Sequence, residues 1–277
     1  MPIVKLAVVG GNRGGAFNHT LNLLKDKVKL TCICDVSEDK VNEWKKNFPD
    51  IDGYTNYDEM LEKGDFDAVF IATPIKLHYS QTMKALKASK HVLSEVYLAD
   101  TIEEISNIVK TVEETGKVYM MAENYVYQRE NMMVLNMVNK GLFGEITYAE
   151  GMYIHDCRPI RFNWDGTLTW RGEQIKEERG NTYPTHSLGP VAKWMGITET
   201  DTMLRSATFC SQNASIRNYI RKKFGNDHFA LGDDFWKYGD CTITTIECAS
   251  GAVITLRFDG DSYRPHNMNY YQLQGVN

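Results

Sequence analysis

The stretch Val9-Gly10-Gly11-Asn12-Arg13-Gly14-Gly15 decides the fold of the first half of the chain. It follows an apolar run over residues 3–10 and precedes a segment, residues 16–25, with the apolar spacing of a helix. Glycines between a first strand and a first helix let the backbone approach a pyrophosphate, although glycines also serve any tight turn. The stretch is not a regular Gly-x-Gly-x-x-Gly pattern: either Asn12 occupies the position of the middle glycine, or one residue is missing.

Strand and helix patterns alternate from this stretch to residue 122. Strands that alternate with helices of about ten residues or more are typical of βαβ units and a parallel sheet. We therefore predict an α/β fold whose N-terminal domain, residues 1–123, is an NAD-binding Rossmann domain with a doubly wound parallel sheet. The runs expected to form its strands include residues 3–10, 28–35, 68–72, 91–95 and 118–122.

A different pattern begins after residue 123. Residues 130–140 have helical spacing, and two polar segments, 156–184 and 212–239, are longer than ordinary connections and typical of binding loops. We expect residues 124–277 to form an α+β substrate-binding domain with an open, mostly antiparallel sheet. Its strand-like runs are residues 146–154, 202–211, 241–248 and 252–259.

The composition argues against several classes of protein. The chain has 277 residues, is 43% hydrophobic and carries a net charge of −5, which gives no general attraction to nucleic acid or anionic membranes. No apolar run approaches the ~20 residues that span a bilayer. The chain enters a strand almost at once without a visible signal peptide, so we expect a cytoplasmic protein, although an exported precursor trimmed of its signal would look the same. The scattered cysteines favour reduced thiols and no metal site.

Polar residues follow the predicted strands at the positions where parallel sheets bind ligands. Asp35 ends a strand about 20 residues after the glycine stretch, where a carboxylate binds the adenine-ribose hydroxyls and repels a 2′-phosphate. This favours NAD over NADP. Thr73 and His78 follow another strand, and Glu95 and Asn124 follow two more. The alternatives are a solvated histidine in the first turn of a helix for His78, and turn or capping roles for Glu95 and Asn124.

The run from Gly180 to Pro190 places the phenol of Tyr183 three residues before the imidazole of His186. Both side chains can move protons, and a nicotinamide can take up and return a hydride, so the pair favours redox chemistry on a hydroxylated substrate. Packing beside Pro184 is the alternative. The preceding segment is basic, which suits hydrogen bonds to a hydroxylated or anionic ligand or, alternatively, a solvated loop. Its arginines are Arg158, Arg161, Arg171 and Arg179.

The N-terminal half resembles the Gfo/Idh/MocA superfamily of NAD(P)-dependent oxidoreductases. The residues that carry the resemblance are Val69 to Pro74, His78, and Lys90 to Val92 leading to Glu95. Most members have Glu-Lys-Pro where this chain has Glu95-Val96-Tyr97, and their lysine helps to move the proton of the substrate hydroxyl. The missing lysine favours a reaction other than an ordinary dehydrogenation.

The second half is similar to the NAD-dependent glycoside hydrolases typified by α-N-acetylgalactosaminidase, glycoside hydrolase family 109, which also have Glu-Val at positions 95–96. That family continues beyond the position of Asn277, so we expect the second domain to be truncated. It tends to have Trp, Pro, Gly and Tyr where this chain has Ile75, Tyr97, Ser187 and His266. The matching stretches are Glu123-Asn124, Met133 to Val138, Gly141 to Glu145, Glu150-Gly151, Tyr153 to Asp156, Trp170-Arg171 and Tyr183 to His186.

The resemblance implies a sugar site lined by Tyr153, Arg171, Tyr183 and His186, with Tyr183 and His186 as the catalytic pair whose individual roles stay open. Bound NAD⁺ would oxidise the sugar at C3, C2 would lose its proton, the C1 aglycone would leave, water would add, and the ketone would be reduced again. The alternatives are an NAD-dependent sugar or polyol dehydrogenase, and a truncated paralogue that binds NAD without activity. The open sheet face predicts a homo-oligomer through the C-terminal sheet. The residues expected to bind NAD are Gly11, Asn12, Arg13, Asp35, Thr73, Ile75, Leu77, His78, Glu95, Val96 and Asn124.

Overall fold

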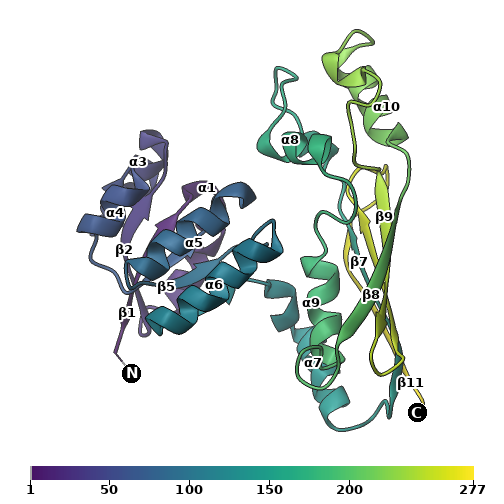
Figure 1. Ribbon diagram of the computed structural model, residues 1–277. Helices are drawn as coiled ribbons and strands as arrows, with labels where there is room; N and C mark the ends of the chain where they lie inside the picture. The colour runs from purple at the N-terminus through teal and green to yellow at the C-terminus, as the bar shows by residue number, and fades with distance from the viewer. Residues whose placement is uncertain (1) are drawn as a thin grey trace. The chain divides into compact units, whose positions relative to one another are not determined.

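The computed structural model describes residues 2–277, which form two compact units that divide between Ala122 and Glu123 (Figure 1). The first unit contains a six-stranded sheet in the order β3-β2-β1-β4-β5-β6, in which every neighbouring pair is parallel. This is the doubly wound Rossmann architecture that the alternating pattern predicts. Its strands are β1 (Val4–Val9), β2 (Val28–Cys34), β3 (Asp52–Tyr54), β4 (Ala68–Ile71), β5 (His91–Ser94) and β6 (Tyr119–Met121).

Helices cover both faces of this sheet because alternate residues of a strand point to opposite sides. Ala7 and Val9 lie in one hydrophobic cluster with Ile108 of α6 (Ile102–Thr115), whereas Val8 lies in a second cluster with Trp44 of α3 (Glu38–Asn47). The other helices are α1 (Gly11–Gly14), η1 (Gly15–Phe17), α2 (Asn18–Leu23), α4 (Tyr57–Lys63), η2 (Ile75–Leu77) and α5 (His78–Lys87).

The second unit contains a five-stranded sheet in the order β11-β7-β10-β9-β8. Only β7 and β10 pair in parallel, so the sheet is mostly antiparallel, as predicted. The edge strand β11 is an addition, because the sequence pattern predicts no strand after residue 259. The strands are β7 (Ile146–Ile154), β8 (Met203–Cys210), β9 (Cys241–Cys248), β10 (Val253–Asp259) and β11 (Asn267–Gly275).

One face of the second sheet is packed against helix α9 (Thr185–Trp194), which contacts β7, β10 and β11, and α7 (Arg129–Asn139) packs against α9 and the same hydrophobic cluster. Val191 and Trp194 of α9 share a hydrophobic cluster with Leu256 of β10. This packing fixes α9 on the sheet, and with it the histidine in its first turn.

The two long polar segments of this unit, predicted as loops, contain helices. Thr169 caps α8 (Trp170–Glu177) by accepting the Gly172 N–H, and Asp240 accepts the N–H groups of Ser215 and Ile216 at the start of α10 (Ala214–Phe224). Asp240 lies 25 residues after Ser215 in sequence, so the local pattern did not indicate this cap. Shorter helical turns are η3 (Asn124–Tyr127), η4 (Arg158–Ile160) and η5 (Phe229–Leu231).

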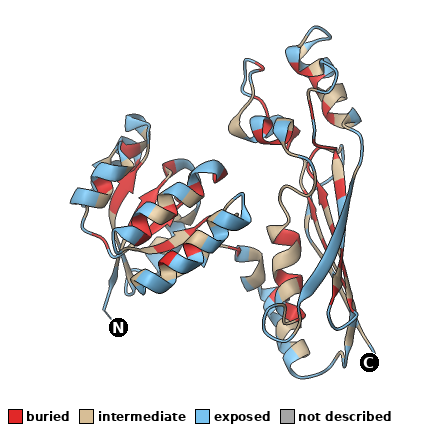
Figure 2. Ribbon diagram, in the orientation of Figure 1, coloured by how far each residue is buried: buried red, intermediate tan, exposed pale blue. Residues whose placement is uncertain are grey.

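The edge strand β8 is exposed along most of its length, and Figure 2 draws it almost entirely in pale blue. Phe209 is 73% exposed and pairs across the strands with Ile243, which is 46% exposed. Exposed apolar pairs on a sheet edge are uncommon in monomers, because they invite association with another strand or sheet.

The helices within residues 2–277 are all too short or too polar to cross a membrane. The six cysteines are free thiols, and four of them, Cys32, Cys34, Cys157 and Cys248, are buried. Burial, together with the charge of Asp35, raises the pKa of Cys34 to about 12, so this thiol stays protonated at neutral pH.

Candidate functional site

The turn after β1 depends on glycine. Gly10 has a φ of +91°, and a Cβ atom at this position would lie 2.5 Å from the backbone oxygen of Ala72. Its N–H donates to the backbone oxygen of Cys34 at 2.9 Å, so the turn is tied to the ends of both neighbouring strands. The strand order runs outward in opposite directions from β1 and β4, and such a switch point is where doubly wound sheets bind their ligands.

Asp35 lies directly after β2 and joins two turns. Its Oδ2 accepts the Gly11 N–H at 2.7 Å, and its Oδ1 accepts the Ser37 N–H at 2.9 Å. The predicted cofactor residues Gly11 and Asp35 are therefore in direct contact. Asn12 and Arg13 follow on the exposed side of the turn.

Arg13 reaches from this turn to the end of β5. Its Nε lies 2.6 Å from Oε1 of Glu95, and the Arg13 side chain is 51% exposed whereas that of Glu95 is 8% exposed. Two residues that are 82 positions apart in sequence, both predicted for the cofactor site, are thus joined by a half-buried ion pair.

His78 connects the loop after β4 to the loop after β5. Its Nε2 lies 2.9 Å from the backbone oxygen of Thr73, and its Nδ1 lies 2.9 Å from that of Tyr97. The side chain is buried, so the alternative of a solvated histidine is wrong. Of the neighbouring predicted residues, Ile75 and Val96 are also buried, and Leu77 is exposed.

The Tyr183–His186 pair lies at the start of α9, in the second unit. The Tyr183 hydroxyl lies 3.4 Å from Nε2 of His186, and Nδ1 of His186 lies 2.9 Å from Oε1 of Glu123. The same Oε1 accepts the backbone N–H of Tyr125 at 3.1 Å. A phenol, an imidazole and a carboxylate therefore form one hydrogen-bonded chain, of the kind that moves protons in many enzymes.

Glu123 belongs to this hydrogen-bonded series, although the sequence analysis did not assign it to the site. It precedes Asn124, which begins η3 in the second unit and is exposed. No spacing rule indicates a contact over 63 residues between Glu123 and His186. In the fold, Gly189 of α9 permits the close approach, since a Cβ atom there would lie 2.6 Å from Cγ of Glu123.

Aromatic rings surround the histidine. The ring centroid of His186 lies 4.2 Å from that of Tyr125, 5.0 Å from that of Tyr153 and 5.2 Å from that of Tyr183. Burial, reinforced by the phenols of Tyr183 and Tyr125, raises the pKa of Tyr153 far above its ordinary value. Tyr153 is therefore a protonated phenol at neutral pH, and its hydroxyl lies 3.2 Å from Nδ1 of His155.

Basic side chains lie near His155, the hydrogen-bond partner of Tyr153. The ring of His155 lies 4.9 Å from that of His266. Burial, with His266 and Arg161 nearby, lowers the pKa of His155, and Arg171 acts in the same direction. Arg171 is exposed, and its guanidinium lies 4.1 Å from the ring centroid of Trp170.

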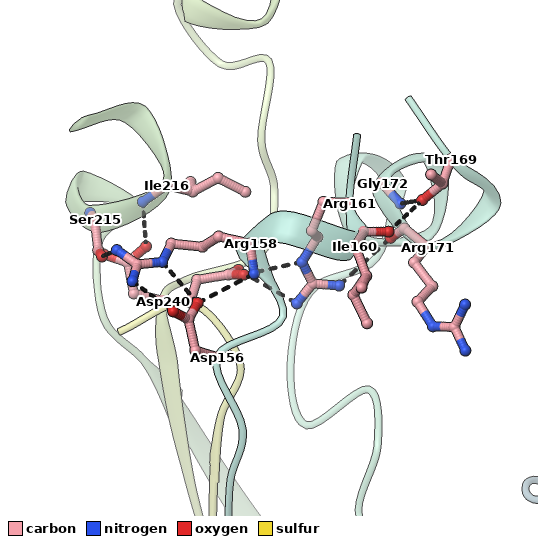
Figure 3. A network of polar contacts seen from close by, with 11 residues as sticks. Asp156, Arg158, Ile160, Arg161, Thr169, Arg171, Gly172, Ser215, Ile216 and Asp240 are labelled. Carbon is pink, nitrogen blue, oxygen red and sulfur yellow. Dashed lines mark hydrogen bonds and ion pairs between the residues drawn. The ribbon is translucent and has the colours of Figure 1, made fainter. Parts of the chain in front are cut away.

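Arg158 and Arg161 do not form the basic loop surface considered from the sequence. Arg158 is buried and makes two bonds of 2.7 Å to the carboxylate of Asp156, and a third of 3.1 Å to Ser215 (Figure 3). Arg161 is paired with Asp261. A buried guanidinium needs an internal carboxylate, so these arginines are occupied within the fold. The Arg171 side chain points away from these pairs in Figure 3, and Arg179 is exposed.

Comparison with known families divides the chain in two. Residues 127–277 match the model of the C-terminal domain of glycosyl hydrolase 109. Residues 4–123 match the model of an oxidoreductase family with an NAD-binding Rossmann fold.

Two curated relatives illustrate the similarity. A glycosyl hydrolase family 109 protein of Shewanella sp. (strain ANA-3) is 34% identical over 290 residues, which cover 100% of this chain and 62% of the relative. An α-N-acetylgalactosaminidase of Bacteroides fragilis (strain ATCC 25285) is 33% identical over 279 residues, covering 96% of this chain and 65% of the relative. The chain thus spans just under two thirds of the length of these relatives.

The fold is shared with a solved structure of scyllo-inositol dehydrogenase from Lactobacillus casei with bound NAD(H) and scyllo-inositol. The TM-score is 0.76 at 16% sequence identity, and the match covers 99% of this chain and 74% of the dehydrogenase. At this identity the likeness concerns the fold alone.

Proposed function

This chain belongs to the glycosyl hydrolase 109 family, and from that premise we propose that it is an NAD-dependent glycosidase that cleaves α-N-acetylgalactosaminides. The observation that carries the proposal is the chain of hydrogen bonds from Tyr183 through His186 to Glu123. It supplies a proton-moving group in a protein whose other unit has the Rossmann fold.

The residues after the strands of the first unit fit a dinucleotide. The glycines of the turn let Gly10 pack against the backbone after β4 and Gly11 against α3, and Asp35 offers a carboxylate to ribose hydroxyls. Exposed Asn12 and Arg13 are available to the same ligand. We propose that NAD is held by these residues, with Gly11, Thr73, Ile75, Leu77, His78, Glu95, Val96 and Asn124.

NAD, when bound, would supply the reversible removal of hydride from C3 of the sugar while the C3 hydroxyl releases its proton, and the resulting ketone would make the proton on C2 acidic. The chain must then take that proton as the aglycone leaves C1, and must return a proton when water has added to the enone. Tyr183 and His186 are the residues proposed for this transfer. No pair of catalytic carboxylates, as in ordinary glycosidases, is required by this scheme.

Tyr153 and Arg171 are proposed to bind the sugar. Tyr153 keeps its proton because burial raises its pKa, so it can donate a hydrogen bond to a hydroxyl or carbonyl oxygen of the substrate. Arg171 has a planar guanidinium that suits a carbonyl or hydroxyl acceptor. Val96, in place of the lysine that most Gfo/Idh/MocA oxidoreductases carry, supports a hydrolase over a net dehydrogenase.

The test is hydrolysis of 4-nitrophenyl α-N-acetylgalactosaminide in D₂O. We expect release of nitrophenol, deuterium at C2 of the released sugar, and no net accumulation of NADH. A product without deuterium at C2 would exclude the elimination. Free NADH formed in step with substrate consumption would instead support a sugar or polyol dehydrogenase. Retained NAD without any turnover would support a non-catalytic paralogue.

We also propose that copies of the chain associate through the open sheet. The exposed pair of Phe209 and Ile243 supports this, because association would remove its apolar surface from water. A charged residue at either position would oppose such a sheet-to-sheet contact. Sedimentation velocity should give an oligomer for the wild type and a smaller species for Phe209→Glu. A monomeric wild type at tens of micromolar would exclude the proposal.

A further inference from the structure

We infer that Glu123 is a positioning residue, which fixes the ring proton of His186 on Nδ1 and leaves Nε2 free to accept the proton of Tyr183. The inference rests on the proposed function for its catalytic meaning, whereas the protonation pattern itself can be measured without turnover. It also divides the roles of the catalytic pair: Tyr183 faces the substrate, and His186 receives the proton behind it.

The hydrogen bonds around Glu123 determine the tautomer. Oε1 accepts the backbone N–H of Tyr125 at 3.1 Å, so this oxygen acts as an acceptor, and Nδ1 of His186 lies 2.9 Å from it. A carboxylate can only accept, so Nδ1 must carry a hydrogen. A neutral imidazole has one N–H, and Nε2 therefore has a lone pair 3.4 Å from the Tyr183 hydroxyl.

The fold holds both partners rigidly. The side chains of Glu123 and His186 are 8% and 7% exposed, so water has little access to either group. Gly189 brings α9 so close to Glu123 that any larger residue would meet its Cγ, at 2.6 Å for a Cβ atom. From the other side, the Tyr271 hydroxyl donates to the backbone oxygen of His186 at 2.6 Å. The imidazole therefore has little freedom to turn its other nitrogen toward the carboxylate.

The second oxygen of Glu123 points to a role beyond packing. Oε2 is buried and has no hydrogen-bond partner among residues 2–277. A half-satisfied buried carboxylate is costly and calls for a specific explanation, of which a catalytic role is one. The cost falls when the neighbouring imidazole becomes positively charged, as it does when His186 takes the proton of Tyr183.

Proton transfer in this site has a defined direction. The titratable groups that face or adjoin His186 are Glu123, Tyr125, Tyr153, Tyr183 and Tyr271, contributed by η3, β7, β11 and the residues just before η3 and α9. Glu123 supplies the only carboxylate among them. Loss of the Tyr183 proton to Nε2 is therefore balanced by the Glu123 charge, and the proton returns by the same path.

The direct test is ¹⁵N–¹H correlation spectroscopy of the full chain labelled at the histidine ring nitrogens, with His186 assigned by its loss in His186→Asn. We expect the Nδ1–H tautomer in the wild type and mainly the Nε2–H tautomer in Glu123→Met, whose side chain has similar volume and no acceptor. Tyr271→Phe, which removes a hydrogen bond to the backbone of the same histidine, should keep the Nδ1–H tautomer. The Nε2–H tautomer in the wild type, or no change in Glu123→Met, would overturn the inference.

Kinetics give the second measurement. Glu123→Met should lower kcat at least about 100-fold with KM changed by less than about threefold, since general acid–base positioning is lost and substrate contacts are kept. If Glu123→Met does not fold, Glu123→Asp withdraws the carboxylate by one methylene and should give a mixture of the two tautomers. A chain that shows the predicted tautomers but no glycosidase turnover supports the positioning role and overturns the proposed reaction.

Discussion

The guanidinium of Arg161 and the carboxylate of Asp261 form an ion pair in which the side chains are only 5% and 1% exposed. Two nitrogens of the guanidinium contact the two carboxylate oxygens, at 2.9 and 3.3 Å. A third contact, at 3.5 Å, reaches the backbone oxygen of Arg171. The pair thus connects the end of β10 to the segment that carries the proposed sugar-binding arginine, 100 residues earlier.

Removal of one partner of this pair should destabilise the second unit strongly. We expect Arg161→Met to lower the free energy of unfolding by about 3–5 kcal/mol, because it leaves the Asp261 carboxylate buried without a counter-charge. Urea unfolding followed by tryptophan fluorescence would measure the change.

Two further variants give the comparison. Arg161→Met combined with Asp261→Leu should recover part of the loss, since neither charge is then buried alone. Lys193→Met breaks an exposed pair with Glu199 of 2.7 Å and should lower the free energy of unfolding far less than Arg161→Met. Equal losses in the buried and exposed pairs would contradict the argument.

The glycine turn after β1 gives a second prediction. Gly10→Ala places a methyl group 2.5 Å from a backbone oxygen at a φ of +91°. We expect this to lower the free energy of unfolding, measured by heat or urea, by about 3 kcal/mol. Gly116→Ala is the matched control: its φ is +62°, but nothing lies within 4 Å of the added methyl group. That variant should lose only about 1 kcal/mol. Similar losses would show that backbone conformation, and not close packing of the turn, requires Gly10.

The Rossmann sheet could be predicted from sequence because its signals are local. The glycine stretch, the apolar runs and the acid at Asp35 each lie within one strand–helix unit, and the periodicity of each unit indicates its structure. The bounds of the short strand β3 were not predicted, because its three residues, Asp52 to Tyr54, have no apolar alternation.

The second unit was less predictable because its contacts join distant segments. Arg158 looks like a surface arginine in the sequence, and only Asp156 and the packing of α10 reveal that it is buried. Glu123 reaches His186 through the tertiary fold, and β11 has a pattern that mixes polar and aromatic residues on both faces. Tyr183 and His186 were identifiable because they lie three residues apart.

Asp35 should determine the preference between NAD and NADP. Asp35→Asn removes the negative charge beside the ribose site, so we expect NAD affinity to fall about tenfold and NADP affinity to rise relative to it. Titration calorimetry with both cofactors would measure the ratio. Asp39→Asn, an exposed acid at the start of α3, is the control for a general charge effect. An unchanged NAD-to-NADP ratio in Asp35→Asn would remove Asp35 from the site.

Cys34 should make stability fall with rising pH. Its pKa is about 12 in the folded chain and 9.0 as the ordinary value, so above pH 9 the unfolded chain binds fewer protons than the folded chain. The free energy of unfolding then decreases as pH rises, by about 1 kcal/mol at pH 10 for this thiol. Between pH 8 and pH 10, the free energy of unfolding of Cys34→Ala should therefore fall by about 1 kcal/mol less than that of the wild type. Parallel pH curves for the two proteins would show that the thiol does not contribute.

The two tyrosines of the proposed sugar site should differ in kinetic signature. Tyr183→Phe removes the hydroxyl that lies 3.4 Å from Nε2 of His186, so proton transfer at C2 is lost, and we expect kcat to fall by at least about 100-fold. Tyr153→Phe removes a neutral hydrogen-bond donor and should chiefly raise KM, by about three- to tenfold.

Exchange of the C2 proton with solvent measures proton transfer separately from hydrolysis, and so distinguishes the two variants. With the NAD-loaded enzyme and free N-acetylgalactosamine in D₂O, Tyr153→Phe should still incorporate deuterium at C2 at high sugar concentration, whereas Tyr183→Phe should not at any concentration. Both variants keep the Glu123–His186 contact of 2.9 Å, so the tautomer of the histidine serves as the check that the site is intact. Rapid deuterium incorporation by Tyr183→Phe would transfer the role of substrate base from the phenol to His186 itself.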